Sequence, residues 1–158
     1  MGANEAFISQ TVRPREYLTF RLGGEEYGID ILRVQEIRSY EAPTRIANAP
    51  DYIKGVVNLR GVIVPIVDLR IRFATAQCEY NDFTVVVVLH VGGRVVGAVV
   101  DAVSDVLEVA ADAVRPAPEM SSVVDAGCIV GLATIAERML ILLDIEKLMT
   151  DPAMGLTD

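Results

Sequence analysis

The chain has 158 residues and a formal net charge of -8, because 14 lysines and arginines face 22 aspartates and glutamates. This length suits one domain or two small barrels that bury roughly 70% of the unfolded surface. Apolar residues make up 52% of the chain, yet runs such as Val85–Leu89 are far shorter than the roughly 20 residues of a membrane span. The acidic balance argues against nucleic acid as a partner. With no secretion or acylation signal, we expect a cytoplasmic protein without direct membrane insertion.

The first predicted element after an N-terminal tail, 1–15, is a β-hairpin. Thr19–Leu22 is a short apolar segment that ends at Gly23-Gly24, and apolar residues then resume on alternate positions. The same pattern recurs at Val87–Val91, which ends at Gly92-Gly93. Paired glycines between two alternating segments are typical of tight hairpin turns.

Three short helices are predicted along the chain. Ala49–Gly55 has an early proline and aspartate, a late lysine and a final glycine, so one or two helical turns fit there. Asp68–Phe73 and Asp144–Met149 each begin with a capping aspartate and place apolar residues three or four apart. A second tail follows at 151–158.

An internal repeat connects these elements. A shift of 69, the difference between Gly92 and Gly23, also superposes Gly28 on Gly97, and a shift of 76 superposes Asp68 on Asp144. We infer two copies of one β unit of roughly 70 residues, with extra residues near 117–126 in the second copy. Small units of this kind close as barrels, which removes exposed sheet edges.

Several segments resemble the CheW family of chemotaxis proteins. They are Glu25–Ile31, Val34–Ile37, Ile53–Val56, Asn58–Leu69 and Val99–Val106, in unbroken order. The resemblance implies a mainly β fold with two small five-stranded SH3-like or OB-like barrels, related by duplication and with strands exchanged. We expect a single domain at 16–150, with subdomains at roughly 16–80 and 81–150.

Enzymatic chemistry has little support in the sequence. A nucleophile system would need His90, the one histidine, which we interpret as a strand-end residue. Cys78 and Cys128 are fifty positions apart and form no metal-binding pair, so we predict no metal site and no cofactor. Asp68 and Asp144 are explained by capping. We predict that the protein is not an enzyme.

The family resemblance implies a non-catalytic adaptor with two partners. These are the cytoplasmic tips of methyl-accepting chemoreceptors and the regulatory domain of the histidine kinase CheA. The resemblance also implies that the protein is a monomer by itself and becomes part of a larger array that is associated with the membrane. We assign receptor contact to Val34, Arg60, Gly61, Val103 and Val106, and kinase contact to Ile31, Glu36, Lys54, Gly55 and Ile63.

Local pattern gives these residues an independent, weaker interpretation. Strand alternation predicts that Val34 and Glu36 share one face, with Ile37 on the other. Ile37 and Val103 are better explained as core, while Val34 and Val106 fit core and contact equally. Arg60 is predicted at a hairpin tip, where an arginine orients well on a partner. The alternative function is a β-barrel that binds a ligand or an oligonucleotide.

Overall fold

The computed structural model describes residues 15–73, 79–116 and 126–150. The strands are β1 (Arg15–Leu22), β2 (Glu25–Asp30), β3 (Val34–Ser39), β4 (Ile53–Leu59), β5 (Val62–Asp68), β6 (Val85–Val91), β7 (Arg94–Val100), β8 (Ala102–Val109), β9 (Val114–Arg115), β10 (Ile129–Ile135) and β11 (Arg138–Leu143). The helices are η1 (Ile31–Arg33), α2 (Leu69–Arg72), η2 (Ala111–Ala113), η3 (Ala126–Cys128) and α3 (Ile145–Thr150). In this described part, no helix has the length and apolar character that would let it cross a membrane.

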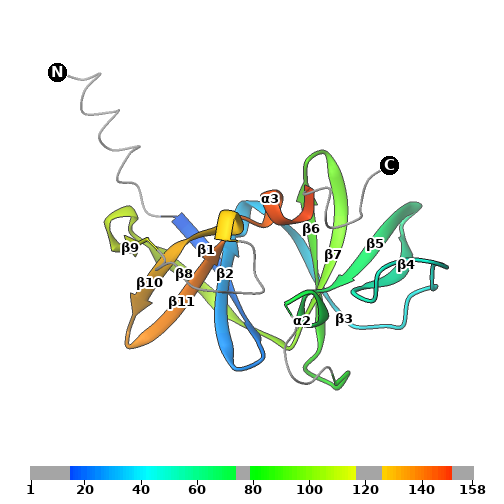
Figure 1. The fold of residues 1–158 in the computed structure, drawn as a ribbon, viewed down its shortest axis with the longest axis horizontal. Helices are drawn as coiled ribbons and strands as arrows, with labels where there is room; N and C mark the ends of the chain where they lie inside the picture. Colours follow the sequence, from blue (N-terminus) through cyan, green and yellow to red (C-terminus); the bar gives the residue numbers. More distant parts are fainter. Residues whose placement is uncertain (1–14, 74–78, 117–125, 151–158) are drawn as a thin grey trace.

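The strands form two sheets that lie side by side (Figure 1). A six-stranded sheet has the order β8-β1-β2-β11-β10-β9, and a five-stranded sheet has the order β3-β6-β7-β5-β4. Hairpin β1–β2 therefore sits among strands of the second half of the chain, and hairpin β6–β7 sits among strands of the first half. The predicted mainly β fold with few short helices is confirmed.

The sheet orders carry the sequence repeat. A shift of 69 places β1, β2 and β3 on β6, β7 and β8, and a shift of 76 places β4 and β5 on β10 and β11. When each strand of the five-stranded sheet is replaced by its repeat equivalent, its order becomes the order of the first five strands of the six-stranded sheet, which agrees with duplication. Each sheet also curls, because the segment that follows the edge strand β3 or β8 pairs with a strand on the opposite side of the same sheet. Thr44, after β3, pairs with Val56 on β4, and β9, after β8, pairs with β10.

Alternate residues of the central strands enter two different cores. On β6, Val86 and Val88 lie inside the five-stranded sheet, whereas Val87, Leu89 and Val91 face the six-stranded sheet. The largest apolar cluster is the one shared between the sheets, and α2 and α3 contribute to it. Because the inner strands are covered on both faces, they consist of nearly continuous apolar runs.

Two of the three predicted helices are confirmed. Asp68 accepts a hydrogen bond from Arg70 N at 3.0 Å to cap α2, and Asp144 accepts one from Lys147 N at 3.0 Å at the start of α3. The prediction of a helix at Ala49–Gly55 is wrong. Residues 51–52 form a turn and Ile53 begins β4, because backbone pairing with β5 outweighs the local proline and glycine signals.

Candidate functional site

The β4–β5 hairpin presents Arg60 at its tip, as predicted. Arg60 and Gly61 both have positive φ, 53° and 89°, which is the geometry of a two-residue hairpin turn whose twist matches the strands. Asn58 Oδ1 accepts a hydrogen bond from Gly61 N at 2.8 Å and fixes the turn. The Arg60 side chain is 69% exposed, so it is oriented by the turn and remains available to a partner.

Arg60 forms an ion pair with Glu36 on β3. Strands β3 and β4 are opposite edges of the five-stranded sheet, so this pair bridges the sheet where it curls. Arg38 also donates to Glu36, at 3.2 Å. The hydrogen bond from Arg60, then that from Arg38, lowers the pKa of the Glu36 carboxyl. The structure thus joins one residue assigned to the receptor with one assigned to the kinase.

A β-bulge in β3 changes the predicted faces of its side chains. Val34 lies opposite Leu89 and Glu36 lies opposite Val88, so Gln35 has no partner residue of its own. Opposed residues share a face, which places Val34 on the side of the core between the sheets and Glu36 on the other side. The prediction that Val34 and Glu36 share a face is therefore wrong, and Val34 instead shares its face with Ile37.

The same bulge occurs at the repeat-related position in β8. Val103 lies opposite Phe20 and Asp105 lies opposite Thr19, so Ser104 is the extra residue. Val103, like Val34, is half-buried against the core between the sheets, and Val106 is 46% exposed on the same face. Three of the predicted receptor residues, Val34, Val103 and Val106, thus lie on the faces of β3 and β8 that border the junction between the sheets.

The residues assigned to the kinase are less uniform. Ile63 on β5 is 59% exposed, whereas Ile31 in η1 is half-buried against the core between the sheets. The Lys54 ammonium lies 5.8 Å from the ring centre of Tyr80. Gly55 is buried, with φ 141°, and a Cβ there would lie 2.0 Å from the carbonyl oxygen of Thr44. Its lack of a side chain is required by that close approach.

Sequence reasoning missed two exposed apolar side chains near these positions. Ile37, which the strand pattern favours as core, is 44% exposed, because β3 is an edge strand with a neighbour on one side only. Leu32, in η1, is 85% exposed. The signal that would have found Ile37 is its repeat equivalence with Val106, since 37 plus 69 is 106 and both are exposed.

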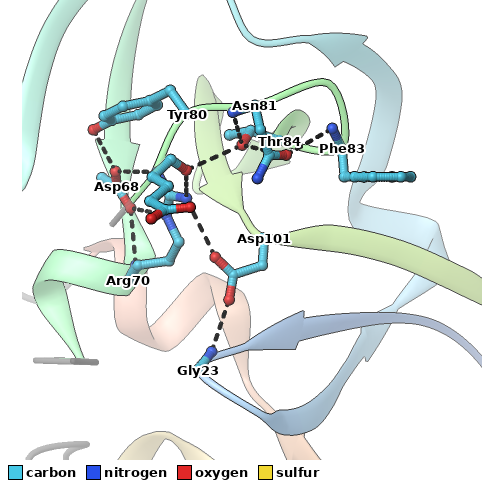
Figure 2. A network of polar contacts seen from close by, with 9 residues as sticks. Gly23, Asp68, Arg70, Tyr80, Asn81, Phe83, Thr84 and Asp101 are labelled. Atoms are coloured by element: carbon cyan, nitrogen blue, oxygen red, sulfur yellow. Dashed lines mark hydrogen bonds and ion pairs between the residues drawn. The ribbon is translucent and has the colours of Figure 1, made fainter. Parts of the chain in front are cut away.

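A buried polar network was also missed, and Figure 2 shows it. Arg70 Nε and Nη2 donate to the two oxygens of Asp68 at 3.0 Å each, and both side chains are almost fully buried. Arg70 Nη1 also donates to Asp101 at 3.2 Å, and the Tyr80 hydroxyl donates to Asp68 at 2.7 Å. Burial, followed by the bond to Asp68, raises the pKa of Tyr80. Such a network specifies geometry because every polar group has a partner.

Two of the residues considered for chemistry lie within the described part of the chain. His90 is exposed on β6, and Cys128 is buried in the core between the sheets. Cys78 lies outside the described residues, as do 1–14, 151–158 and most of the 117–126 connection. Within 15–73, 79–116 and 126–150, no three histidine, cysteine or acidic side chains gather in a way that would hold a metal ion.

Comparisons with known proteins agree with the geometry. The CheW-like domain model matches residues 16–153. The chain is 59% identical to the chemotaxis protein CheW of Klebsiella aerogenes over 144 residues, which cover 91% of this chain and 87% of the relative. It is 38% identical to the chemotaxis protein CheW of Rhizobium meliloti over 133 residues, or 84% and 86% of the two chains.

The structure is similar to the crystal structure of the scaffolding protein CheW of Thermoanaerobacter tengcongensis. The TM-score is 0.78 at 30% sequence identity, and the match covers 85% of this chain and 87% of the other. The level of identity and the extent of the match both exceed what a shared architecture alone requires. The chain belongs to the CheW-like family of chemotaxis proteins.

Proposed function

We propose that this protein is a non-catalytic adaptor that couples methyl-accepting chemoreceptors to the histidine kinase CheA. It works in the cytoplasm as a monomer that joins membrane-associated receptor arrays. The observation that carries the proposal is the Glu36–Arg60 pair, which joins one residue of each predicted contact set. Exposed apolar side chains at Ile37 and Ile63, on strands next to this pair, supply what a protein interface needs.

The receptor face in this proposal consists of Val34, Arg60, Gly61, Val103 and Val106. Its valines border the junction between the sheets, so an elongated partner would contact both sheets at once. The kinase face consists of Ile31, Glu36, Lys54, Gly55 and Ile63. Of these, Ile63 and Glu36 offer the accessible groups, whereas Gly55 acts through the backbone approach of Thr44. Gly55 is expected to affect binding by shaping β4.

The kinase face is tested by reversing its charge and removing its apolar anchor separately. Glu36→Lys places a cation between Arg38 and Arg60, so affinity for the CheA regulatory domain should fall at least about tenfold. Ile63→Ala should weaken binding by a similar or smaller factor, because it removes exposed apolar area without a charge. Titration calorimetry with purified CheA fragment measures both, and circular dichroism verifies the fold.

Met139→Ala is the matched control for Ile63→Ala. Residue 139 is the repeat equivalent of Ile63, since 63 plus 76 is 139, and its side chain is 55% exposed on the other sheet. It should bind the kinase fragment normally. Unchanged affinity for the CheA fragment in both Glu36→Lys and Ile63→Ala, with intact folds, would contradict the assignment of kinase contact to this face.

A further inference from the structure

The two exchanged hairpins are fastened at their turns in the same way. Gly23 begins the β1–β2 turn and Gly92 begins the β6–β7 turn, 69 residues later. Gly23 N donates to Asp101 Oδ2 at 2.8 Å, and Gly92 N donates to Glu146 Oε1 at 3.0 Å. In each case the acceptor is a carboxylate that lies outside the hairpin. The two turns point to opposite sides of the molecule (Figure 1).

Each of these carboxylates also pairs with an arginine. Asp101 Oδ1 lies 3.2 Å from Arg70 Nη1, and Glu146 Oε2 lies 3.1 Å from Arg33 Nη2. We call Gly23, Asp101 and Arg70 the buried latch, after its buried arginine (Figure 2), and Gly92, Glu146 and Arg33 the exposed latch, after its exposed arginine.

Both latches cross from one sheet to the other, with their charges interchanged. Asp101 lies where the chain passes from β7 to β8, and Arg70 follows β5. Arg33 lies where the chain passes from β2 to β3, and Glu146 follows β11. Arg70 and Glu146 are repeat equivalents, since 70 plus 76 is 146. In one copy the helix supplies the cation and in the other it supplies the anion.

The arginines of the two latches differ sharply in burial, whereas the carboxylates do not, since Asp101 is 33% exposed and Glu146 is 38% exposed. Arg70 is 1% exposed and is also held by Asp68 and by the carbonyl oxygen of Glu79. Arg33 and Glu146 are 42% and 38% exposed. An ion pair in contact with water is screened and contributes little, whereas a buried, fully hydrogen-bonded pair is lost only with its whole network.

We propose that the two sheets change their relative angle by opening the exposed latch while the buried latch acts as the pivot. The apolar cluster between the sheets permits this because apolar contact is not directional, whereas the latches add directional contacts on opposite sides of that cluster. The inference concerns the isolated protein and does not depend on the proposed adaptor function. A partner that contacts both sheets would be sensitive to this angle.

The experiment measures residual dipolar couplings of backbone amides in the two sheets of the purified full chain. In wild type at low salt, one alignment tensor should fit both sheets. Glu146→Ala should require two tensors of different magnitude, and the Gly92 amide should exchange with solvent at least about fivefold faster while Gly23 is unchanged. High salt should move wild type toward the Glu146→Ala result.

Arg60→Ala is the matched control, because it removes an exposed ion pair that lies within one sheet. It should keep a single tensor. Asp101→Asn keeps an acceptor for Gly23 N but weakens the pair with Arg70, and it should lower the urea midpoint more than Glu146→Ala does. A single tensor in Glu146→Ala, at both low and high salt, would overturn the proposal. Two tensors in Asp101→Asn with one in Glu146→Ala would show that pivot and opening side are reversed.

Discussion

Glu36 is the residue on which the two proposed faces depend, because one carboxylate holds both Arg60 and Arg38. Removing Arg60 leaves Arg38 as a donor at 3.2 Å, so Glu36 stays ionised and in place. Removing Glu36 instead leaves two neighbouring cations without their shared anion. The two substitutions therefore have unequal consequences, although they break the same ion pair.

This asymmetry gives a prediction for Arg60→Ala. Direct affinity for the CheA regulatory domain should stay within about twofold of wild type, because Arg38 keeps the Glu36 carboxylate oriented. Receptor-stimulated kinase activity in reconstituted arrays should fall strongly, because the exposed tip arginine is lost. A variant that binds receptor normally but loses the kinase would show that the two faces are assigned in reverse. Arg115→Ala, an exposed arginine on β9, is the control.

At the scale of elements, strand and turn positions could be predicted and strand faces could not. Paired glycines and the Arg60-Gly61 dipeptide mark turns because few residues adopt positive φ. The bulges at Gln35 and Ser104 have no such mark, and each moves every following side chain to the other face. The helix prediction at Ala49–Gly55 failed for a related reason, since pairing with β5 is a tertiary contact.

The ion pairs that bridge the curled sheets also differ between the copies. Arg138, at the start of β11, donates to both oxygens of Asp105 at 3.0 Å and also binds Glu26 on β2. The hydrogen bonds from Arg138 are the largest cause of the lowered pKa of both carboxyl groups. Two anions on one cation join β2, β8 and β11 in the six-stranded sheet, whereas in the five-stranded sheet two cations share the one anion of Glu36.

A pH dependence follows from this cluster. Because the folded-state pKa values of Glu26 and Asp105 lie below their unfolded values, the stabilisation is present above the unfolded values and is lost as pH falls through the folded ones. Wild type should therefore lose more of its urea midpoint between about pH 6 and about pH 3 than Arg138→Met does. Arg15→Met, which breaks a looser 3.7 Å pair with Asp30, should behave like wild type. Equal losses in all three proteins would contradict the role of Arg138.

At the scale of the whole molecule, the sequence repeat does not correspond to two separable folding units. In the first copy, β3 and β5 belong to one sheet but are separated there by β6 and β7. The first copy's own β1 and β2 lie in the other sheet, next to β8 and β11. The duplication could be read from glycine spacing, but nothing local in the sequence specifies which copy each hairpin joins. That choice is made by the shared core, to which both copies contribute.

The exchange predicts how the chain behaves when it is divided. Fragment 1–76 keeps β1 to β5 but lacks β6, β7, β8 and β11, so β3, β5, β1 and β2 each lose a partner strand and much of the shared core is exposed. Fragment 77–158 has the equivalent defect. Neither fragment should show a cooperative urea transition by circular dichroism, whereas an equimolar mixture should regain one, with a midpoint that rises with concentration because the fragments associate. A cooperative transition in fragment 1–76 alone would show that the first copy closes on its own hairpin, and the exchanged arrangement would then be one of two accessible folds.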